Sequence, residues 1–479
     1  MTDRTAPFVG RSKELKLLNQ LKNKKISSLV VIKGRRRVGK SRLIQEFAKG
    51  SNFYEFSGLS PDKKITAEQQ REHFASQLSA RTGRKSINAN DWNFLFNELA
   101  NEVEGKKCII LFDEISWLGS KDETFLGKLK TAWDTLFKKN PQLILVLCGS
   151  VSAWIEKNIL RSQLFLGRVS LPITLKELSV PICKALLVEL GGMFSNYELF
   201  KILSVTGGIP RYLEEIQTNQ SAEENIKRLC FTETGILVHE FKDIFTDIFT
   251  RRNEIYKKII EFLAQKSATV HDISEVLKVE QGGYLSDCLE ELCEAEIINR
   301  HFTWSIVNGK ESNLSQYALR DNYMRFYLKY IEQNLSKIKE NHYESLSLNN
   351  LSGWSTIAGL QFQNLVLNNR DFILQKLNAN RANIINDNPF FQRKTQRRRG
   401  CQIDYLIQTR ENILYICEIK FSRHEIKSDI IDEMKTKLNN IEAPKGFALL
   451  PVLVHVNGVS ESLLDSNYFY SIIDFSELL

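Results

Sequence analysis

The chain has 479 residues, of which 43% are hydrophobic and 25% are charged, and its formal net charge is +8. These values are ordinary for a soluble globular protein, and the length predicts three or four domains. The longest apolar run, LILVLC at residues 143–148, is far too short to cross a bilayer, which needs about 18 residues. We therefore expect no membrane partner. The mild positive charge permits nucleic-acid binding without demanding it.

The cysteine pattern and the N-terminal segment indicate the cellular compartment of the protein. The eight cysteines form no C-x-x-C pair, and several lie in apolar, strand-like runs. This pattern is typical of reduced core thiols and excludes a disulfide or zinc framework. The start of the chain, MTDRTAPFVG, has no apolar export segment. We therefore expect a cytoplasmic protein.

The first half of the chain alternates apolar strands with helical patterns. SLVVIKG (28–34), CIILFDEI (108–115) and LILVLCGS (143–150) are predicted strands, and a helix is predicted from Lys40. Fully apolar strands separated by helices predict a parallel sheet covered on both faces. The expected architecture is α/β, and ligands of such sheets bind at the carboxyl ends of the strands.

The first predicted strand ends in GRRRVGKS, which fits G-x-x-x-x-G-K-[ST] without a mismatch. Glycines let backbone N–H groups face phosphate oxygens, and the next helix points its positive end at them. Lys40 is predicted to reach the β- and γ-phosphates, and the Ser41 hydroxyl to ligate Mg²⁺. The predicted ATP-binding residues here are Gly34, Arg35, Arg36, Arg37, Val38, Gly39, Lys40, Ser41 and Arg42. The three consecutive arginines either add positive potential or point to solvent.

Two later strands end in further candidate catalytic residues. Asp113 and Glu114 follow a buried strand, where adjacent carboxylates are costly unless a cation needs them. Asp113 is predicted to hold Mg²⁺ through water, and Glu114 to orient and deprotonate the attacking water. Ser150 ends the third strand. It either positions that water or forms a plain turn.

These motifs resemble a known family. FVGRSKEL (8–15), the P-loop, LFDEI, LCGS, LFLGR (164–168) and GGIPRYLEE (207–215) occur in the order found in AAA+/STAND-like P-loop ATPases of the archaeal type. The core is also similar to origin-recognition ATPases. The resemblance implies that Phe8, Val9, Gly10 and Arg11 lie by the adenine, and that Gly208 and Pro210 lie next to the nucleotide. It implies a γ-phosphate or finger role for Arg168, whose alternative is a salt bridge.

Residues 250–305 change character. EIYKKIIEFLAQ, TVHDISEVL and GGYLSDCLEELCEAEIINR read as three helices followed by a strand. This is the outline of a winged helix, whose third helix can enter a DNA major groove. That helix carries the acidic residues Asp287, Glu290, Glu291, Glu294 and Glu296. A packing or protein-contact role is therefore expected rather than base reading. The segment 317–331 has helical spacing of aromatic residues and is expected in the core.

The last 140 or so residues contain a charged hairpin, IDYLIQTRENILYICEIK at 403–420. A turn centred on Glu411 sets Asp404 opposite Glu418 on one face, and Lys420 shares that face. Two carboxylates suit a hard divalent cation, and Lys420 could orient or polarise the attacking water. The alternative is an ordinary half-exposed hairpin with a Glu–Lys pair.

The D-x₁₃-E-x-K spacing resembles the PD-(D/E)XK nuclease fold. A helix is predicted before the hairpin at 353–369, and a strand after it at 447–456. Family members usually carry a glutamate in the preceding helix, where this chain has Gln363, a poorer metal ligand. The basic run RKTQRRRG at 393–400 would suit a phosphate backbone, although a solvated loop is the default.

The sequence therefore predicts a multidomain α/β protein. The expected parts are a P-loop ATPase core (1–175), a helical lid (176–245), a winged-helix-like domain (246–335) and a nuclease-like, restriction-endonuclease-type domain (336–479). The expected function is Mg²⁺-dependent ATP hydrolysis coupled to DNA binding or cleavage. Two alternatives are a nucleotide-dependent switch that binds nucleic acid without cutting, and a winged-helix transcriptional regulator. The implied partners are ATP, DNA and a second copy of the chain.

Overall fold

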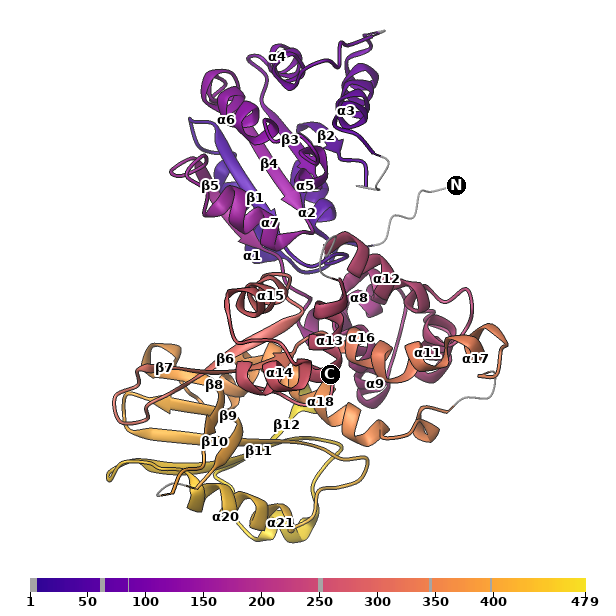
Figure 1. Ribbon diagram of the computed structural model, residues 1–479. Coiled ribbons are helices and arrows are strands. Elements are labelled where there is room, and N and C mark those ends of the chain that lie inside the picture. Colours follow the sequence, from indigo (N-terminus) through magenta and orange to yellow (C-terminus); the bar gives the residue numbers. More distant parts are fainter. Residues whose placement is uncertain (1–6, 61–64, 85, 249–252, 344–346, 397–398) are drawn as a thin grey trace.

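The computed structural model describes residues 7–60, 65–84, 86–248, 253–343, 347–396 and 399–479. A parallel sheet near the amino end and a mixed sheet near the carboxyl end lie at opposite ends of the molecule, with helices between them (Figure 1). None of the helices in these ranges combines the length and apolar character that crossing a bilayer requires.

The first sheet is the scaffold of the predicted ATPase core. Its strand order is β2-β3-β4-β1-β5, and every neighbouring pair is parallel. The strands are Ser28–Lys33 (β1), Asn52–Ser57 (β2), Cys108–Asp113 (β3), Leu143–Gly149 (β4) and Val169–Thr174 (β5). The central strands β1, β3 and β4 are buried almost throughout, as the apolar runs predicted. Their carboxyl ends therefore meet at one edge of the sheet.

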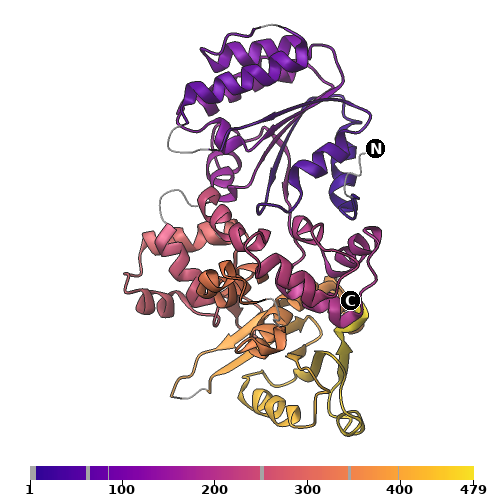
Figure 2. The ribbon, with the colours of Figure 1, turned by 90° about the vertical axis from the view of Figure 1, so that its right-hand side faces the viewer.

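Helices cover both faces of this sheet, which is seen from the side in Figure 2. Leu18 and Leu43 belong to the apolar cluster on one face, and Phe74, Phe96 and Leu129 to that on the other. The helices are Ser12–Leu21 (α1), Lys40–Ala48 (α2), Ala67–Thr82 (α3), Trp92–Glu102 (α4), Ile115–Leu118 (α5), Phe125–Thr135 (α6) and Ser152–Ile155 (α7). Two layers of helices around a parallel sheet are the expected α/β architecture.

The middle of the chain is helical. The lid region holds Val180–Glu189 (α8), Asn196–Thr206 (α9), Pro210–Leu213 (α10), Ala222–Cys230 (α11) and Ile236–Ile248 (α12). We use the name three-helix module for Asn253–Leu263 (α13), Val270–Leu277 (α14), Gly283–Glu294 (α15) and the antiparallel hairpin Ile298–Trp304 (β6) and Glu311–Leu319 (β7). Thr269 caps α14 through a capping box with Asp272, which fixes where that helix begins.

The acidic helix α15 faces the ATPase core. Glu294 pairs with Lys33, the last residue of β1, and Glu290 lies 2.8 Å from a guanidinium nitrogen of Arg161. These contacts agree with the packing role predicted for this helix. They also oppose base reading by α15 in this arrangement, because the acidic side chains on this face are already occupied by cations of the same chain.

The second sheet has the order β12-β11-β10-β9-β8. Strands β8, β9 and β10 are antiparallel neighbours, whereas β11 and β12 run parallel to β10. The strands are Ile384–Gln392 (β8), Cys401–Thr409 (β9), Ile413–Phe421 (β10), Ala448–Val456 (β11) and Ser471–Asp474 (β12). The helices around it are Asn322–Phe326 (α16), Leu335–Lys339 (α17), Trp354–Asn368 (α18), Arg370–Lys376 (α19), Ile430–Asn440 (α20) and Glu461–Asp465 (α21).

One apolar cluster runs through all of these parts. It includes Val30 of β1, Phe200 of α9, Leu289 of α15, Phe362 of α18 and Val454 of β11. The ring centroids of Phe200 and Phe421 are 5.0 Å apart and the rings are stacked. The lid, the three-helix module and the second sheet thus share one hydrophobic core. The predicted division into separate domains did not indicate a shared core.

Some segments differ from the sequence prediction. Strands β2, β5, β7, β8 and β12 were not predicted. The segment 317–331 begins in β7 and becomes helical only from Asn322, so its predicted helix starts too early. The aromatic residues there are buried, as expected. Within the basic run, Arg397 and Arg398 lie outside the described residues.

A buried imidazole on β6 makes stability depend on pH. His301 is 7% exposed, and burial, aided by the charges of Arg370 and Arg320, lowers its pKa to about 4. The unfolded chain, with a histidine pKa near 6.5, binds more protons between pH 6.5 and 4. Stability contributed by neutral His301 is therefore present above pH 6.5 and is lost as the pH falls toward 4.

We expect this loss to reach about 3 kcal/mol across that window. The measurement is chemical denaturation of the wild type and of a His301→Gln variant at several pH values. The wild type should lose more stability than the variant between pH 6.5 and 4. Parallel stability curves for the two proteins would contradict the assignment of this loss to His301.

Candidate functional site

The P-loop joins β1 to α2 at the carboxyl edge of the first sheet. Arg37 and Gly39 adopt left-handed φ angles of 70° and 90°, which curl the backbone before the helix begins. A side chain at Gly34 would place its Cβ 2.3 Å from the Leu175 carbonyl oxygen, so only glycine fits there. The ammonium of Lys40 donates to the carbonyl oxygens of Gly34 and Arg35 at 3.0 and 3.2 Å.

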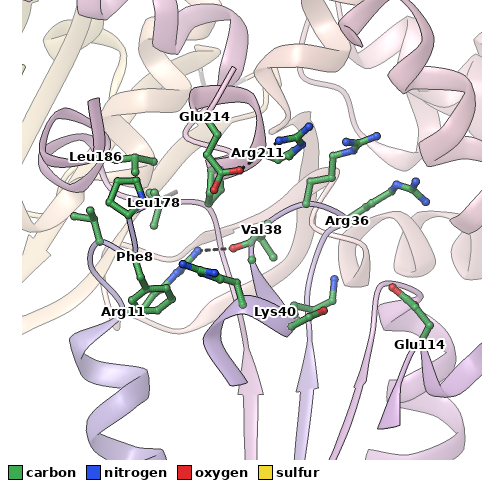
Figure 3. A pocket seen from close by; sticks show the side chains of 17 residues that line it. Phe8, Arg11, Arg36, Val38, Lys40, Glu114, Leu178, Leu186, Arg211 and Glu214 are labelled. Atoms are coloured by element: carbon green, nitrogen blue, oxygen red, sulfur yellow. Dashed lines mark hydrogen bonds and ion pairs between the residues drawn. The ribbon is translucent and has the colours of Figure 1, made fainter. Parts of the chain in front are cut away.

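A cavity of about 440 Å³ opens beside this loop. Phe8, Leu178 and Leu186 line one end, whereas Lys40 and Glu114 stand at the other (Figure 3). The volume falls in the ordinary range for small-molecule sites. An apolar end and a cationic end match the two ends of a nucleotide. The full lining is Pro7, Phe8, Val9, Arg11, Arg36, Arg37, Val38, Gly39, Lys40, Ser41, Arg42, Glu114, Leu178, Leu186, Pro210, Arg211 and Glu214.

Two pairs of polar side chains flank Lys40. The Ser41 hydroxyl donates to the Asp113 carboxylate at 2.6 Å, so these two predicted Mg²⁺ ligands are side by side. The Glu114 carboxylate accepts hydrogen bonds from the Ser150 backbone N–H at 3.0 Å and from its hydroxyl at 2.9 Å. Ser150 thus orients Glu114. The sequence had suggested two other roles for Ser150, positioning of the attacking water or a plain turn.

Glu114 combines burial with a strained backbone. Its φ of 49° is left-handed, which is rare for a residue other than glycine and is typical of functional sites. Burial raises the pKa of its carboxyl group, and the ammonium of Lys40 and the hydrogen bonds from Ser150 act in the opposite direction. A raised pKa favours proton acceptance from water in catalysis.

The segment before β1 closes the apolar end of the cavity. Arg11 donates to the carbonyl oxygens of Val38 and Lys176 at 3.0 and 2.7 Å, which ties this segment to the P-loop. Gly10 has a φ of 78°, and a Cβ there would lie 2.6 Å from Ile182. Gly10 therefore shapes the chain without lining the cavity, whereas Pro210 lines it as predicted.

The structure corrects the prediction for the first arginine of the P-loop. The side chain of Arg35 is buried and pairs with Asp321, so it neither lines the cavity nor points to solvent. Arg36 and Arg37 do line the cavity. Arg37 also lies 2.6 Å from the buried carboxylate of Glu240 in the lid.

Arg168 is also displaced from its predicted place. It precedes β5, at the amino end of the sheet, because Val169 pairs with Leu29 near the start of β1. The cavity lies at the carboxyl end, about 20 Å away along a six-residue strand. Arg168 makes a two-pronged ion pair with Asp134, with N–O distances of 2.9 and 2.8 Å. This ion pair lowers the pKa of Asp134 to about 2. Within one chain, Arg168 is therefore a salt-bridge residue.

The second candidate site lies on β9 and β10. Cys417 pairs with Tyr405, and the same antiparallel register sets Asp404 opposite Glu418, as the hairpin centred on Glu411 predicted. The Asp404 carboxylate accepts a hydrogen bond from the Ile419 backbone N–H at 3.0 Å. The amide of Gln363, on α18, donates to the same carboxylate at 3.4 Å.

A lysine that sequence reasoning missed contacts this site. Lys437 of α20 donates to the buried carboxylate of Glu418. Burial raises the pKa of Glu418 to about 7, and the charge of Asp404 adds to this effect. Lys420 lies 2.8 Å from Glu433, also on α20, so the predicted motif lysine has its own partner. No local sequence pattern relates Lys437 to Glu418, which lies 19 residues earlier in the chain.

The donor set suits a hard cation. Mg²⁺ is usually bound through one or two carboxylates plus water and phosphate oxygens, which fits Asp404 with Glu418, and Asp113 with Ser41. The ammonium of Lys437 already supplies a positive charge at Glu418. Over the residues that the structure describes, no group of three or more His, Cys, Asp or Glu side chains is arranged to hold a metal.

The fold and the first site define a P-loop α/β nucleotide-binding domain. Residues 8–216 match the model of a family described as an ATPase domain predominantly from Archaea. The archaeal-type ATPase resemblance is thus confirmed for this part of the chain. The winged-helix and nuclease-like parts of the resemblance remain predictions.

Relatives and solved structures are similar over more of the chain. An uncharacterized protein of Methanocaldococcus jannaschii is 27% identical over 339 residues, which are 70% of this chain and 71% of that protein. A Walker-type ATPase of Pyrococcus abyssi is 21% identical, with a TM-score of 0.49, over 67% of this chain and 96% of that chain. The ORC2 protein of Aeropyrum pernix, in ADPNP–ADP complexes, is 13% identical, with a TM-score of 0.42, over 72% of this chain and 98% of that chain.

We predict that Lys40→Ala lowers the affinity for ATP about tenfold or more, because charge-assisted hydrogen bonds to phosphate are lost. Binding of a fluorescent ATP analogue measures the effect. Lys49→Ala is the matched control, since Lys49 follows the same helix and its side chain is exposed and pairs with Glu46. Equal affinities of the wild type and Lys40→Ala would rule out this cavity as the phosphate site.

Proposed function

We propose that the protein binds and hydrolyses ATP with Mg²⁺, and that hydrolysis is coupled to a C-terminal domain that binds DNA and carries a phosphodiesterase site. One observation carries the ATPase part: Lys40, the Ser41–Asp113 pair and Glu114 converge beside the same cavity. These are the groups that a P-loop needs for phosphate binding, for the cation and for the attacking water.

Each group has a place in the reaction. The base of ATP would lie against Phe8, Leu178 and Leu186, and its phosphates against the P-loop N–H groups and Lys40. Mg²⁺ held by Ser41 and Asp113 would neutralise charge on the phosphate oxygens. Glu114, oriented by Ser150, would hold the attacking water and take its proton.

Replacement of the base tests this assignment. In Glu114→Gln we expect ATP hydrolysis to fall by about 100-fold or more, with ATP binding retained, because general-base catalysis is lost while the binding groups stay. Steady-state phosphate release and an ATP-binding titration measure the two effects. Glu123→Gln, at an exposed position of the same domain, should hydrolyse ATP like the wild type. Hydrolysis by Glu114→Gln at the wild-type rate would exclude Glu114 as the base.

The second part of the proposal concerns the sheet that carries Asp404 and Glu418. A leading helix (α18), the hairpin β9–β10 and a further strand (β11) occur in the order that the nuclease resemblance implies. The opposed carboxylates and two nearby lysines, Lys420 and Lys437, support phosphodiester chemistry. Asp404 and Glu418 would hold a divalent cation, which would polarise the scissile phosphate.

A second candidate is a nucleotide-dependent switch that binds DNA without cutting it. Two observations favour it. Lys420 is paired with Glu433, and the α18 position that usually carries a glutamate holds Gln363. An amide ligates Mg²⁺ less well than a carboxylate, and a paired lysine is less ready to contact water or phosphate.

Plasmid nicking separates the two candidates. The nuclease proposal predicts that the wild type nicks supercoiled DNA with Mg²⁺ or Mn²⁺, and that Glu418→Gln and Lys420→Ala lose about 100-fold or more of this activity. Lys435→Ala, an exposed position on the same helix α20, is the control. A wild type that cuts DNA under no nucleotide condition, but shifts it in a gel to an extent that depends on the nucleotide, would support the switch instead.

A further inference from the structure

Arg35 joins the phosphate-binding lysine to a segment far along the chain. Its carbonyl oxygen accepts a hydrogen bond from the Lys40 ammonium at 3.2 Å, and its guanidinium pairs with Asp321. Arg35 is 4% exposed and Asp321 is 8% exposed. A single buried residue therefore contacts the predicted phosphate ligand at its backbone and a carboxylate 286 positions away at its side chain.

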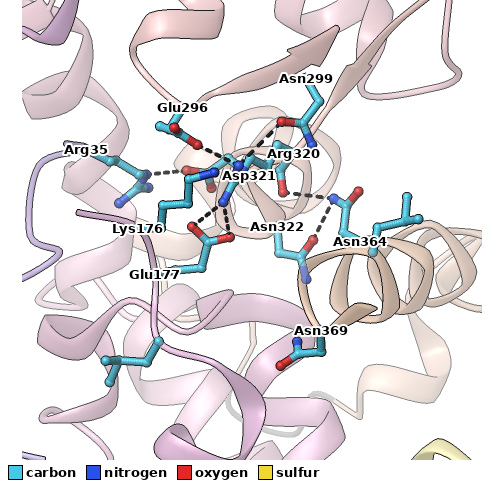
Figure 4. A network of polar contacts seen from close by, with 12 residues as sticks. Arg35, Lys176, Glu177, Glu296, Asn299, Arg320, Asp321, Asn322, Asn364 and Asn369 are labelled. Atoms are coloured by element: carbon cyan, nitrogen blue, oxygen red, sulfur yellow. Dashed lines mark hydrogen bonds and ion pairs between the residues drawn. The ribbon is translucent and has the colours of Figure 1, made fainter. Parts of the chain in front are cut away.

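Asp321 belongs to a segment on which several parts of the molecule converge. We call residues 319–322 the junction segment. The second carboxylate oxygen of Asp321 accepts a hydrogen bond from the Met324 N–H at 2.9 Å and so caps α16. Its neighbour Arg320 pairs with Glu177, which leads into the lid, and with Glu296, between α15 and β6 of the three-helix module, each at 2.6 Å (Figure 4).

Helix α18 is fixed to the same segment through three of its four residues. The amide of Asn364 donates to the carbonyl oxygens of Leu319 and Arg320 at 3.0 and 2.9 Å, and to the side-chain oxygen of Asn322 at 2.9 Å. Figure 4 shows Asn364 reaching the junction segment from this helix. One residue earlier on α18, Gln363 donates to Asp404. Helix α18 thus contacts both the junction segment and the second candidate site.

A second arm joins Arg35 to the lid. The guanidinium of Arg35 donates to the Tyr212 hydroxyl at 3.3 Å, and that hydroxyl donates to Glu240 at 3.0 Å. Glu240 in turn holds Arg37. Arg35 and Arg37 are therefore bound to buried acidic or phenolic groups of the lid and the junction segment.

Two constraints act on Arg35 when nucleotide binds. To bind phosphates, Lys40 would turn away from the P-loop carbonyl oxygens, which would free the carbonyl of Arg35. The guanidinium has to stay with Asp321, because a buried charge without its partner is strongly unfavourable. A shift of the backbone at residue 35 is therefore transmitted to the junction segment.

We propose that Arg35 is a positioning residue that couples the phosphate contact of Lys40 to the junction segment, so that ATP binding changes the packing of α16 and α18. This inference depends on the proposed ATP binding. In this inference, the side chain of Arg35, the first variable residue of the P-loop, acts on Asp321 of the same chain and not on the nucleotide. By linkage, packing of α16 and α18 also sets the affinity for ATP.

Amide hydrogen exchange of the full chain, with and without Mg²⁺ and a non-hydrolysable ATP analogue, tests the proposal. In the wild type we expect exchange in residues 319–331 and 354–368 to change by at least about fivefold. In the double variant Arg35→Met with Asp321→Asn, both partners become neutral, so no buried charge is left unpaired. We expect this variant to bind the analogue without the change in exchange.

Control variants separate coupling from a general loss of structure. Glu296→Gln disturbs Arg320 but leaves the Arg35–Asp321 pair, and it should keep the wild-type response. Arg35→Lys is a second variant, which keeps the charge but loses the forked donor geometry. We expect it to respond less than the wild type while still binding the analogue.

The outcomes are distinguishable. A wild type that binds the analogue but shows unchanged exchange in both segments overturns the coupling and leaves the ATPase proposal standing. A full response in the double variant, or in Arg35→Lys, overturns it too. A wild type that does not bind the analogue, as measured separately by fluorescence titration, overturns the ATPase proposal and this inference together.

Discussion

A guanidinium that is 4% exposed requires a carboxylate beside it, and Arg35 finds one in Asp321, 286 residues further along the chain. Burial alone would lower the pKa of Arg35, but Asp321, Tyr212 and Glu240 together more than offset this effect and raise the pKa. This pair therefore fixes the P-loop to the junction segment. The lid, the three-helix module and α18 are all fixed relative to that segment, so the geometry of the nucleotide site depends on most of the molecule.

Features that depend on local chemistry could be predicted from the sequence. The P-loop motif implies its own turn, and parallel strands bring Asp113 and Glu114 to the edge where Lys40 lies. The register of the β9–β10 hairpin followed from the turn around Glu411, because antiparallel pairing fixes which residues face each other. In each case, the interacting residues are close in sequence or are placed by a regular element.

Other features depend on contacts between distant residues. Strands β2 and β5 lie at the two edges of their sheet and are only partly buried, so their sequences lack a continuous apolar run. No local pattern relates Arg35 to Asp321, or places Lys437 rather than Lys420 at Glu418. Arg168 was assigned from its place in the LFLGR motif, but the parallel pairing of β5 with β1 carries it to the amino end of the sheet.

The continuous apolar core has a consequence for how the chain unfolds. Phe200 of the lid stacks on Phe421 of β10 and lies edge-on to Phe362 of α18, with ring centroids 5.0 and 6.0 Å apart. Separation of the lid from the second sheet would expose these rings to water, at a cost proportional to the apolar area uncovered. The lid and the second sheet should therefore melt in one cooperative transition, and loss of packing in either lowers the thermal stability of both.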